Sequence, residues 1–405
     1  MKQKRSFFII LTAVISTLVC GCTAPELFIH GYNGENGKIK VAAILPLSGK
    51  NRVMAEQMRE GLLLAEQDIN SNSISGRQRL QFRILDSKGT PEGTREAVNE
   101  AARWGASGIV AGYSTSEVSA ILPHVAKMQM PTVIPLATAT EHTMFSPYIY
   151  RNSYTDFQQS EMLANYLLHW RQAKHLGIFI DESGDTNYQG NISRDVSQVM
   201  REIGGSITAT MIIKKQPDTR QITDMLKTDP EAILLTYGGK AAAETIKKLR
   251  QSGFSGIVCG ADNWDNDELI NALDNFKVGD CLYTAFFNDE NNSAEYKNFK
   301  STFRKRFYHN PGACETQSYD ALKFLVIGLD NAETLPQFDK NWRKINRFQG
   351  VSALYTMLPK GEIDRTIYIN SIGVKRVGSK IKPFARLSHK LQYSKLKEYD
   401  MKYYQ

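Results

Sequence analysis

The chain has 405 residues, more than one hydrophobic core usually serves, so we expect two lobes. Its composition, with 42% apolar and 10% aromatic residues, is ordinary for a globular protein. The formal charge of +8 is concentrated at the two ends, because residues 1–5 carry +3 and residues 375–405 carry +7, which leaves −2 between them. Nucleic-acid binding therefore lacks its electrostatic basis, and we predict no nucleic-acid partner.

The first 22 residues have the pattern of an export signal. A basic start at 1–5 precedes an apolar run at 7–19, which is too short to span a bilayer. The following Val-Cys-Gly-Cys at 19–22 resembles a bacterial lipobox, in which the last Cys accepts lipid. We therefore predict a signal peptide over 1–21 and lipidation of Cys22. Two or more acyl chains give stable anchoring, so the protein is expected in the bacterial cell envelope, lipid-anchored on a periplasmic or extracellular face.

Residues 22–37 contain Pro, Gly and Asn with little periodicity, and we expect a tether there. An alternation of strands and helices begins at Lys38, where a continuous apolar run is typical of a parallel strand buried on both faces. Such alternation implies right-handed βαβ units around a parallel sheet. The first series predicts strands at 38–45, 80–85, 107–111 and 132–135, and helices at 54–69, 90–104 and 117–128.

A second series repeats the same order of elements. Two α/β lobes fit this repetition better than one large sheet, and such lobes bind ligands in the crevice at the carboxyl ends of their strands. The second series predicts strands at 175–180, 206–213, 232–236, 256–259 and 281–287, and helices at 192–203, 218–226, 240–252, 294–308 and 316–333.

Hydroxyl-rich loops follow two strands of the first series. Ser114, Thr115 and Ser116 stand at a predicted helix start, where unpaired N–H groups and the helix dipole favour an anion such as a carboxylate. The alternative is plain N-capping. The next loop contains Leu136 and Thr138.

In the second series, Tyr188, Tyr237 and Asp262 come after strands. An acidic side chain in a cleft pairs with an ammonium group while aromatic rings cover the alkyl part of the ligand. The alternative for Asp262 is a cap on the next helix. No nucleophile elbow, P-loop or Gly-x-Gly-x-x-Gly motif occurs, so we predict that the chain is not an enzyme.

The sequence leaves open whether two of the cysteines form a disulfide. Cys259 and Cys281 both flank predicted strand ends, so they either form a disulfide, if those strands are neighbours, or remain buried free thiols. No pair of cysteines has metal-ligand spacing and the seven His are scattered, so we predict neither a metal nor a cofactor.

The order of KVAAILPLSG, AEQDIN, GYSTS, PLAT, RNSYTDFQQS, EMLANYL, TYGG, GADNWD and SYDALKFL resembles the type I periplasmic solute-binding proteins of branched-chain amino acid and amide ABC transporters, over roughly residues 38 to 370. The resemblance implies the type I periplasmic binding protein fold, two Rossmann-like α/β lobes with parallel sheets joined by a hinge. It also implies a small amino acid or amide as the ligand and an ABC permease as the partner. The ranges it implies are 38–155 and 286–356 for lobe 1, 156–285 and 357–380 for lobe 2, and 381–405 for a basic C-terminal tail.

The family's ligand contacts can be carried over residue by residue. The resemblance implies that hydroxyls of lobe 1 bind the ligand's carboxylate, that the Leu136 carbonyl and the Asp262 carboxylate receive its ammonium, and that two tyrosines close over it. The matching positions are Ser114, Thr115, Ser116, Leu136, Thr138, Tyr188, Tyr237 and Asp262.

Two features depart from the family pattern. Met54 stands where amino-acid binders often have an aromatic wall, and the basic tail lies outside the matched range. Both favour a second hypothesis, a sensory or regulatory lipoprotein that uses the same fold to control a protein partner. The tail itself is either a solvated charge run or a contact for anionic lipid or an acidic partner.

Overall fold

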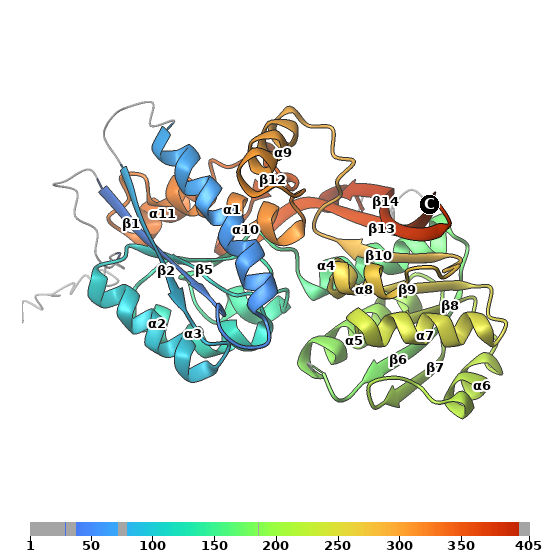
Figure 1. Cartoon of the computed structure of the whole chain (residues 1–405). Coiled ribbons are helices and arrows are strands. Elements are labelled where there is room, and N and C mark those ends of the chain that lie inside the picture. The colour runs from blue at the N-terminus through green and yellow to red at the C-terminus, as the bar shows by residue number, and fades with distance from the viewer. Residues whose placement is uncertain (1–28, 30–37, 72–78, 185, 397–405) are drawn as a thin grey trace, which may run out of the picture.

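The computed structural model describes Ile29 and residues 38–71, 79–184 and 186–396 (Figure 1). The predicted signal peptide, Cys22 and the tether apart from Ile29 therefore lie outside the described residues.

The first series of elements forms a five-stranded parallel sheet in the order β2-β1-β3-β4-β5. The interior strand β1 buries every side chain from Val41 to Leu45, as the continuous apolar run predicts. The elements are β1 (Lys38–Leu45), α1 (Arg52–Ser71), β2 (Arg79–Asp86), α2 (Pro91–Trp104), β3 (Gly108–Val110), α3 (Thr115–Met128), β4 (Thr132–Ile134), the 3₁₀ turn η2 (Thr140–Met144) and β5 (Ile149–Arg151).

The second series forms the parallel part of a nine-stranded mixed sheet, in which β7, β6, β8, β9 and β10 are neighbours in that order. Its elements are α4 (Asp156–Asn165), the π-helix η3 (Tyr166–Trp170), β6 (His175–Asp181), α5 (Thr186–Glu202), β7 (Ser206–Ile213), α6 (Thr219–Leu226), β8 (Ala232–Leu235), α7 (Gly239–Gln251), β9 (Ile257–Gly260), the 3₁₀ turn η4 (Asp262–Trp264), α8 (Asp267–Ala272) and β10 (Cys281–Ala285).

The chain then returns to the side of the five-stranded sheet (Figure 1). Helix α10 packs against α1, β3 and β4, and the approach to α1 is close at Gly61, where a Cβ would lie 2.1 Å from the Glu315 carbonyl oxygen. Any side chain at this position would therefore push the two helices apart. The elements of this return are α9 (Ala294–Phe307), α10 (Ala313–Leu329), α11 (Leu335–Trp342), β11 (Phe348–Gln349), β12 (Leu354–Met357) and the 3₁₀ turn η5 (Pro359–Gly361).

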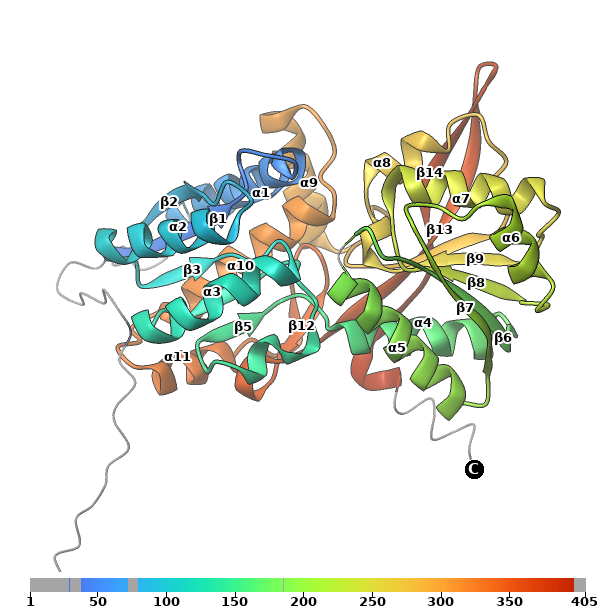
Figure 2. The same ribbon diagram turned by 90° about the horizontal axis from the view of Figure 1, so that it is seen from below.

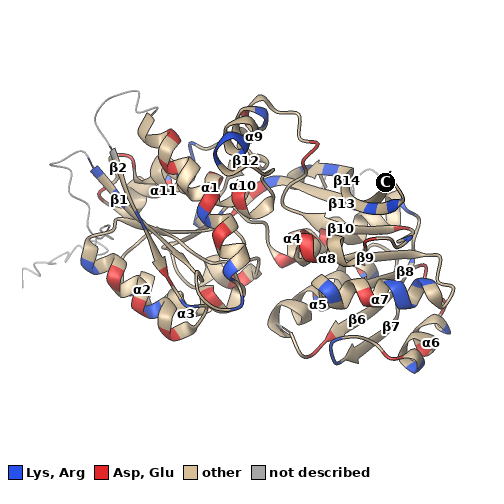
Figure 3. Ribbon diagram, in the orientation of Figure 1, with Lys and Arg blue, Asp and Glu red and all other residues tan. Residues whose placement is uncertain are grey.

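The range expected to be a basic tail begins as a strand. β13 (Ile363–Val377) and β14 (Lys380–Gln392) form an antiparallel hairpin that joins the nine-stranded sheet through β10. The hairpin projects beyond the other elements in Figure 2, and Figure 3 colours several of its positions blue for Lys and Arg. The basic segment is thus structured at least to Leu396, and residues 397–405 are outside the described part of the chain. The expectation of a separate tail from 381 is corrected accordingly.

Three segments connect the two sheets, one after β5, one after β10 and one through the start of β13. A single buried side chain, Arg365, reaches all three: it donates to the Asn152 carbonyl at 2.7 Å and to the Phe286 carbonyl, and it belongs to the third segment itself. It also donates to Gln317 Oε1 on α10 at 2.9 Å. The rings of Tyr154 and Tyr355 lie 5.5 and 5.0 Å from the guanidinium. The buried Arg365 guanidinium therefore ties the three connections between the sheets to one another.

Candidate functional site

A cleft of about 980 Å³ opens between the two sheets, lined by loops that follow strands β3 and β4 on one side and β8 and β9 on the other. These loops lie at the carboxyl ends of parallel strands, where α/β folds place their ligands. Seven of the eight residues predicted for the site line this cleft: Ser114, Thr115, Leu136, Thr138, Tyr188, Tyr237 and Asp262. Met54 lines it as well.

Ser116 is the exception, since it is exposed and does not line the cleft. Its hydroxyl lies 3.1 Å from that of Ser114. Ser114 is the N-cap of α3 and accepts the N–H of Glu117 at 3.2 Å, so the capping alternative holds for this serine. Thr115 begins the helix, is only 7% exposed and faces the cleft.

The carboxylate of Glu117 forms hydrogen bonds with the backbone of the loop that precedes α3. Its Oε2 accepts the N–H groups of Gly112 and Tyr113 at 2.9 and 2.8 Å. Burial raises the pKa of Glu117 to about 7. Our prediction of the site missed this residue, although Glu three positions after an N-cap Ser is the spacing of a capping box.

On the opposite wall, the Tyr188 hydroxyl donates to Asp262 Oδ1 at 2.6 Å. Asp262 belongs to η4, and its backbone N–H donates to Gln159 Oε1 at 3.2 Å. Burial raises the pKa of Asp262. The cap of α8 is Asn266, whose Oδ1 accepts the N–H of Leu269 at 3.0 Å. Asp262 therefore does not cap α8, which was the alternative that the sequence left open.

Tyr237 forms a fixed part of the wall. It is 4% exposed, and its hydroxyl lies 2.9 Å from that of Thr245 on α7. Its carbonyl accepts the indole N–H of the buried Trp264 at 2.8 Å. The hydroxyl contact holds the ring, and the indole contact holds the backbone of the same residue.

Thr138 connects the cleft to a second acidic residue that the sequence did not single out, Asp156. The Thr138 carbonyl accepts the Asp156 N–H at 2.7 Å. Asp156 is fully buried, and burial raises its pKa to about 7, helped by the charge of Asp262 and opposed by hydrogen bonds from Thr138 and Asn191. Two carboxylates thus lie close enough to repel each other beside the cleft.

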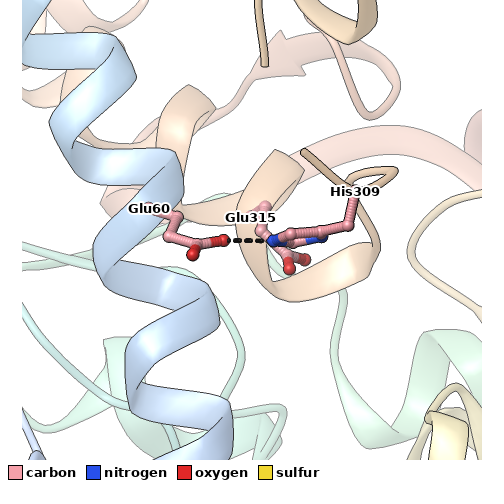
Figure 4. Close-up of side chains that lie close together, drawn as sticks. All are labelled: Glu60, His309 and Glu315. Carbon is pink, nitrogen blue, oxygen red and sulfur yellow. Dashed lines mark hydrogen bonds and ion pairs between the residues drawn. The ribbon is translucent and has the colours of Figure 1, made fainter. Parts of the chain in front are cut away.

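At the end of the cleft near α1, Glu60, His309 and Glu315 place one ligand atom each within 4.8 Å of one another (Figure 4). His309 uses both ring nitrogens, because Nδ1 lies 2.9 Å from the Asn310 carbonyl and Nε2 lies 2.8 Å from Glu60 Oε2. Both partners are oxygen acceptors, so a ring with a proton on each nitrogen satisfies both contacts. Burial lowers the pKa of His309, but the Asn310 carbonyl and Glu60 outweigh it and raise this pKa above its usual value, which favours that protonated form. A metal ion would have to displace that proton. The geometry favours an ion pair.

Cys259 and Cys281 are free thiols, which settles the alternative left open by the sequence. They lie on the neighbouring strands β9 and β10, but Cys281 is in register with Val258 and Leu282 with Cys259. Because side chains alternate between the faces of a strand, the two sulfurs point to opposite sides of the sheet.

The family model for periplasmic binding proteins matches residues 38–372. The chain belongs to the periplasmic binding protein family. Among solved structures, the leucine-binding protein LivK from Thermotoga maritima has a TM-score of 0.73 at 20% identity, over 87% of this chain and 99% of that one. LivJ from Streptococcus pneumoniae, in complex with isoleucine, has a TM-score of 0.71 at 18% identity, over 86% of this chain and 100% of LivJ.

A solute-binding protein from Rhodopseudomonas palustris, in complex with 3,4-dihydroxybenzoic acid, has a TM-score of 0.70 at 18% identity, over 88% of this chain and 98% of that one. Comparison with curated proteins gives no match. The type I periplasmic binding protein fold with parallel α/β sheets, expected from the sequence motifs, is confirmed. Within the described ranges, no helix has both the length and the apolar character needed to cross a membrane.

This periplasmic binding protein has one wall that lies outside the matched range. The family match ends at residue 372, whereas Lys375 and residues 383–385 of the β13–β14 hairpin line the cleft. The Lys375 ammonium lies 5.5 Å from the centre of the Phe384 ring. The hairpin therefore adds to the cleft of the family fold.

Proposed function

We propose that the chain is the lipid-anchored, extracytoplasmic solute-binding component of an ABC transporter and that it takes a small amino acid or amide-like ligand into the cleft. The observation that carries this proposal is the chemistry of the two walls, with the α3 start and hydroxyls on one and the Tyr188–Asp262 pair on the other. The matched family and neighbours that bind leucine, isoleucine or an aromatic acid support it.

Each wall suits one end of an α-amino acid. Thr115 offers a hydroxyl donor, the Thr138 hydroxyl lies in the same wall and also reaches Asp156, and the first N–H groups of α3 have no partner within the helix, so this wall suits a carboxylate. Asp262 suits the ammonium, and the Leu136 carbonyl adds an acceptor beside it. The ligand then spans the cleft from one sheet to the other.

Such a ligand favours a closed form. We assign the lobes to 38–155 with 286–356 and to 156–285 with 357–380, the second extended by the paired strand β14, and we expect them to move about the three connections. A ligand that touches both lobes binds the closed form more tightly than the open one and shifts the population toward it. A permease then recognises the closed shape.

The proposal predicts a stabilising ligand among α-amino acids and small amides. The protein without residues 1–22 is screened by thermal shift against these compounds, because a ligand that binds only the folded state adds about 2.7 kcal/mol at 100 times its Kd. At least one compound is expected to raise the melting temperature, with Ser116→Ala, which lies outside the cleft, responding like wild type. No shift with any of them, at concentrations up to several millimolar, would contradict the proposal.

The anchor is tested separately. Cys22→Ser is expected to abolish labelling of the protein by radioactive palmitate and to leave unprocessed precursor or soluble protein, because no thiol remains at the lipobox position. Cys20→Ser is the matched control and should be labelled like wild type. Labelled Cys22→Ser protein would exclude Cys22 as the lipid site.

The second candidate function is a sensory or regulatory lipoprotein. The hairpin favours it, because the hairpin lines the cleft but lies outside the family match, and a partner that contacts the hairpin would respond to the bound ligand. Genes for a permease and an ATPase beside that of this chain would favour transport. Their absence, with a ligand still bound, would favour the regulatory role.

A further inference from the structure

The cleft is strongly acidic. Six carboxylates line it, and the only basic side chains among its described lining residues are Lys375 and His309. The six are Asp181, Asp262, Asp265, Asp267, Asp289 and Glu315.

The carboxylates fall into two groups by their partners. Asp289 pairs with Lys300 at 2.6 Å, and Asp181 accepts the N–H groups of Ser183 and Lys215 at 2.9 and 2.7 Å. Across the described ranges, no Lys, Arg or His forms an ion pair with the other four. These four, Asp262, Asp265, Asp267 and Glu315, are the unpaired set.

Neither basic residue of the cleft is paired with the unpaired set. His309 is bound to Glu60, and the ammonium of the exposed Lys375 lies over the Phe384 ring. The carboxyl groups of the cleft therefore outnumber its basic side chains, and the four of the unpaired set have no ion-pair partner among the described residues.

Two buried acceptor atoms in the same loop have no hydrogen-bond donor among the described residues. Asp265 Oδ2 and Asn263 Oδ1 are buried with no hydrogen-bond donor in the part of the chain that the structure describes, although both residues line the cleft. Asp265 Oδ1 has one distant donor, the Tyr283 hydroxyl at 3.4 Å. Glu315 lines the same cleft and is 1% exposed. Buried acceptors without donors are rare in native proteins, so this loop lacks a donor-rich partner.

We propose, on the basis of the proposed function, that the ligand carries at least two positive charges, as a basic α-amino acid or a diamine does, with one cation at Asp262 and the other at Asp265. An α-amino acid with an apolar side chain brings one ammonium, which is used at Asp262. An aromatic acid brings none. A second ammonium or a guanidinium supplies the donors that Asp265 Oδ2 and Asn263 Oδ1 lack, and the rings of Tyr283 and Phe286 in the cleft wall favour a cation beside them.

The first test is calorimetry of the protein without residues 1–22 against matched pairs: lysine with norleucine, arginine with citrulline, and putrescine with butylamine. Each pair has about the same length and differs in one charge. The dicationic member is expected to bind at least about tenfold more tightly, as expected for a buried charge partner. Norleucine or citrulline binding as well as its charged partner would overturn this inference and leave the proposed function intact. No binding by any of these compounds, nor by the amino acids and amides of the thermal-shift screen, would overturn both.

Substitution of Asp265 tests where the second cation binds. Asp265→Asn keeps the size of the side chain and removes its charge, so the lysine-to-norleucine preference is expected to fall at least about tenfold while norleucine binding is kept. Asp224→Asn, on exposed helix α6 outside the cleft, is the control. An unchanged preference in Asp265→Asn would overturn the assignment of the second cation.

The pH dependence supplies a second readout. Burial, the charge of Asp262 and the weaker charges of Asp267 and Glu315 raise the pKa of Asp265 to about 8, against the hydrogen bond from Tyr283. A cation binds the ionised carboxylate, so lysine affinity is expected to rise from pH 6 to pH 8 and to rise less in Asp265→Asn. Lysine affinity independent of pH in the wild type would contradict the inference.

Discussion

Asp262→Ala is expected to weaken ligand binding by roughly 30-fold or more and to leave the lobes open. Losing one partner of a buried charge pair costs about 2–5 kcal/mol, because the remaining charge is desolvated without compensation, and 1.4 kcal/mol corresponds to a factor of ten. The Tyr188 hydroxyl also loses its acceptor at 2.6 Å. Isothermal calorimetry with the ligand found by the screen measures the effect.

Thr138→Ala is the comparison on the opposite wall. It removes a neutral hydroxyl and keeps the backbone carbonyl that accepts the Asp156 N–H, so its expected cost is only about 0.5–1.5 kcal/mol. The order of the two losses tests the assignment of charge to each wall. If Asp262→Ala binds within twofold of wild type, the ligand has no ammonium at that position.

Arg365→Met is expected to lower the free energy of unfolding by about 3 kcal/mol or more. The change removes a charged donor from three buried acceptors. The Phe286 carbonyl loses its Arg365 donor, the Asn152 carbonyl keeps only the Gln317 amide at 3.5 Å, and Gln317 Oε1 keeps the hydroxyls of Ser352 and Tyr355. A buried acceptor that loses its donor costs about 1–3 kcal/mol. Urea unfolding followed by the fluorescence of the buried Trp264 and Trp342 measures the change.

Arg220→Met is the matched control for this substitution, because the Arg220 side chain is 88% exposed and pairs only along its own helix. Its stability is expected to stay within about 0.5 kcal/mol of wild type. Equal stability of Arg365→Met and wild type would mean that the cost of burying the guanidinium cancels its hydrogen bonds.

The alternating part of the fold could be predicted because its interior strands are buried on both faces, as in β3, β4, β8, β9 and β10. β1 and β7 have the predicted bounds, and most of the other strands and helices differ by a few residues. β14 could not be predicted in this way. It carries Lys380, Lys382 and Arg386, has Pro383 inside it and pairs only with β13, so its sequence lacks the apolar pattern of a central strand.

Most residues of the cleft could be predicted from their positions in loops after strands and from the family resemblance. The functional residues that the sequence did not reveal share one property. Glu117, Asp156 and Arg365 are charged residues that act from buried positions, and charged side chains are ordinarily exposed. Their partners, such as Gly112 for Glu117 and Asn152 for Arg365, come together only through the fold. Asp265 could not be singled out from the sequence, because an oxygen without a donor is visible only in three dimensions.

The hairpin also has a consequence for the order of events after synthesis. Phe384 and Ala385 line the cleft, and every other residue that lines it comes earlier in the chain. Translation proceeds from the amino terminus, so these two residues leave the ribosome after all the others that line the cleft. Until they emerge, a ligand meets a cavity with one side missing. A cleft with all of its lining residues therefore forms only after residue 385 has been made, and a chain that ends before the hairpin lacks part of the wall.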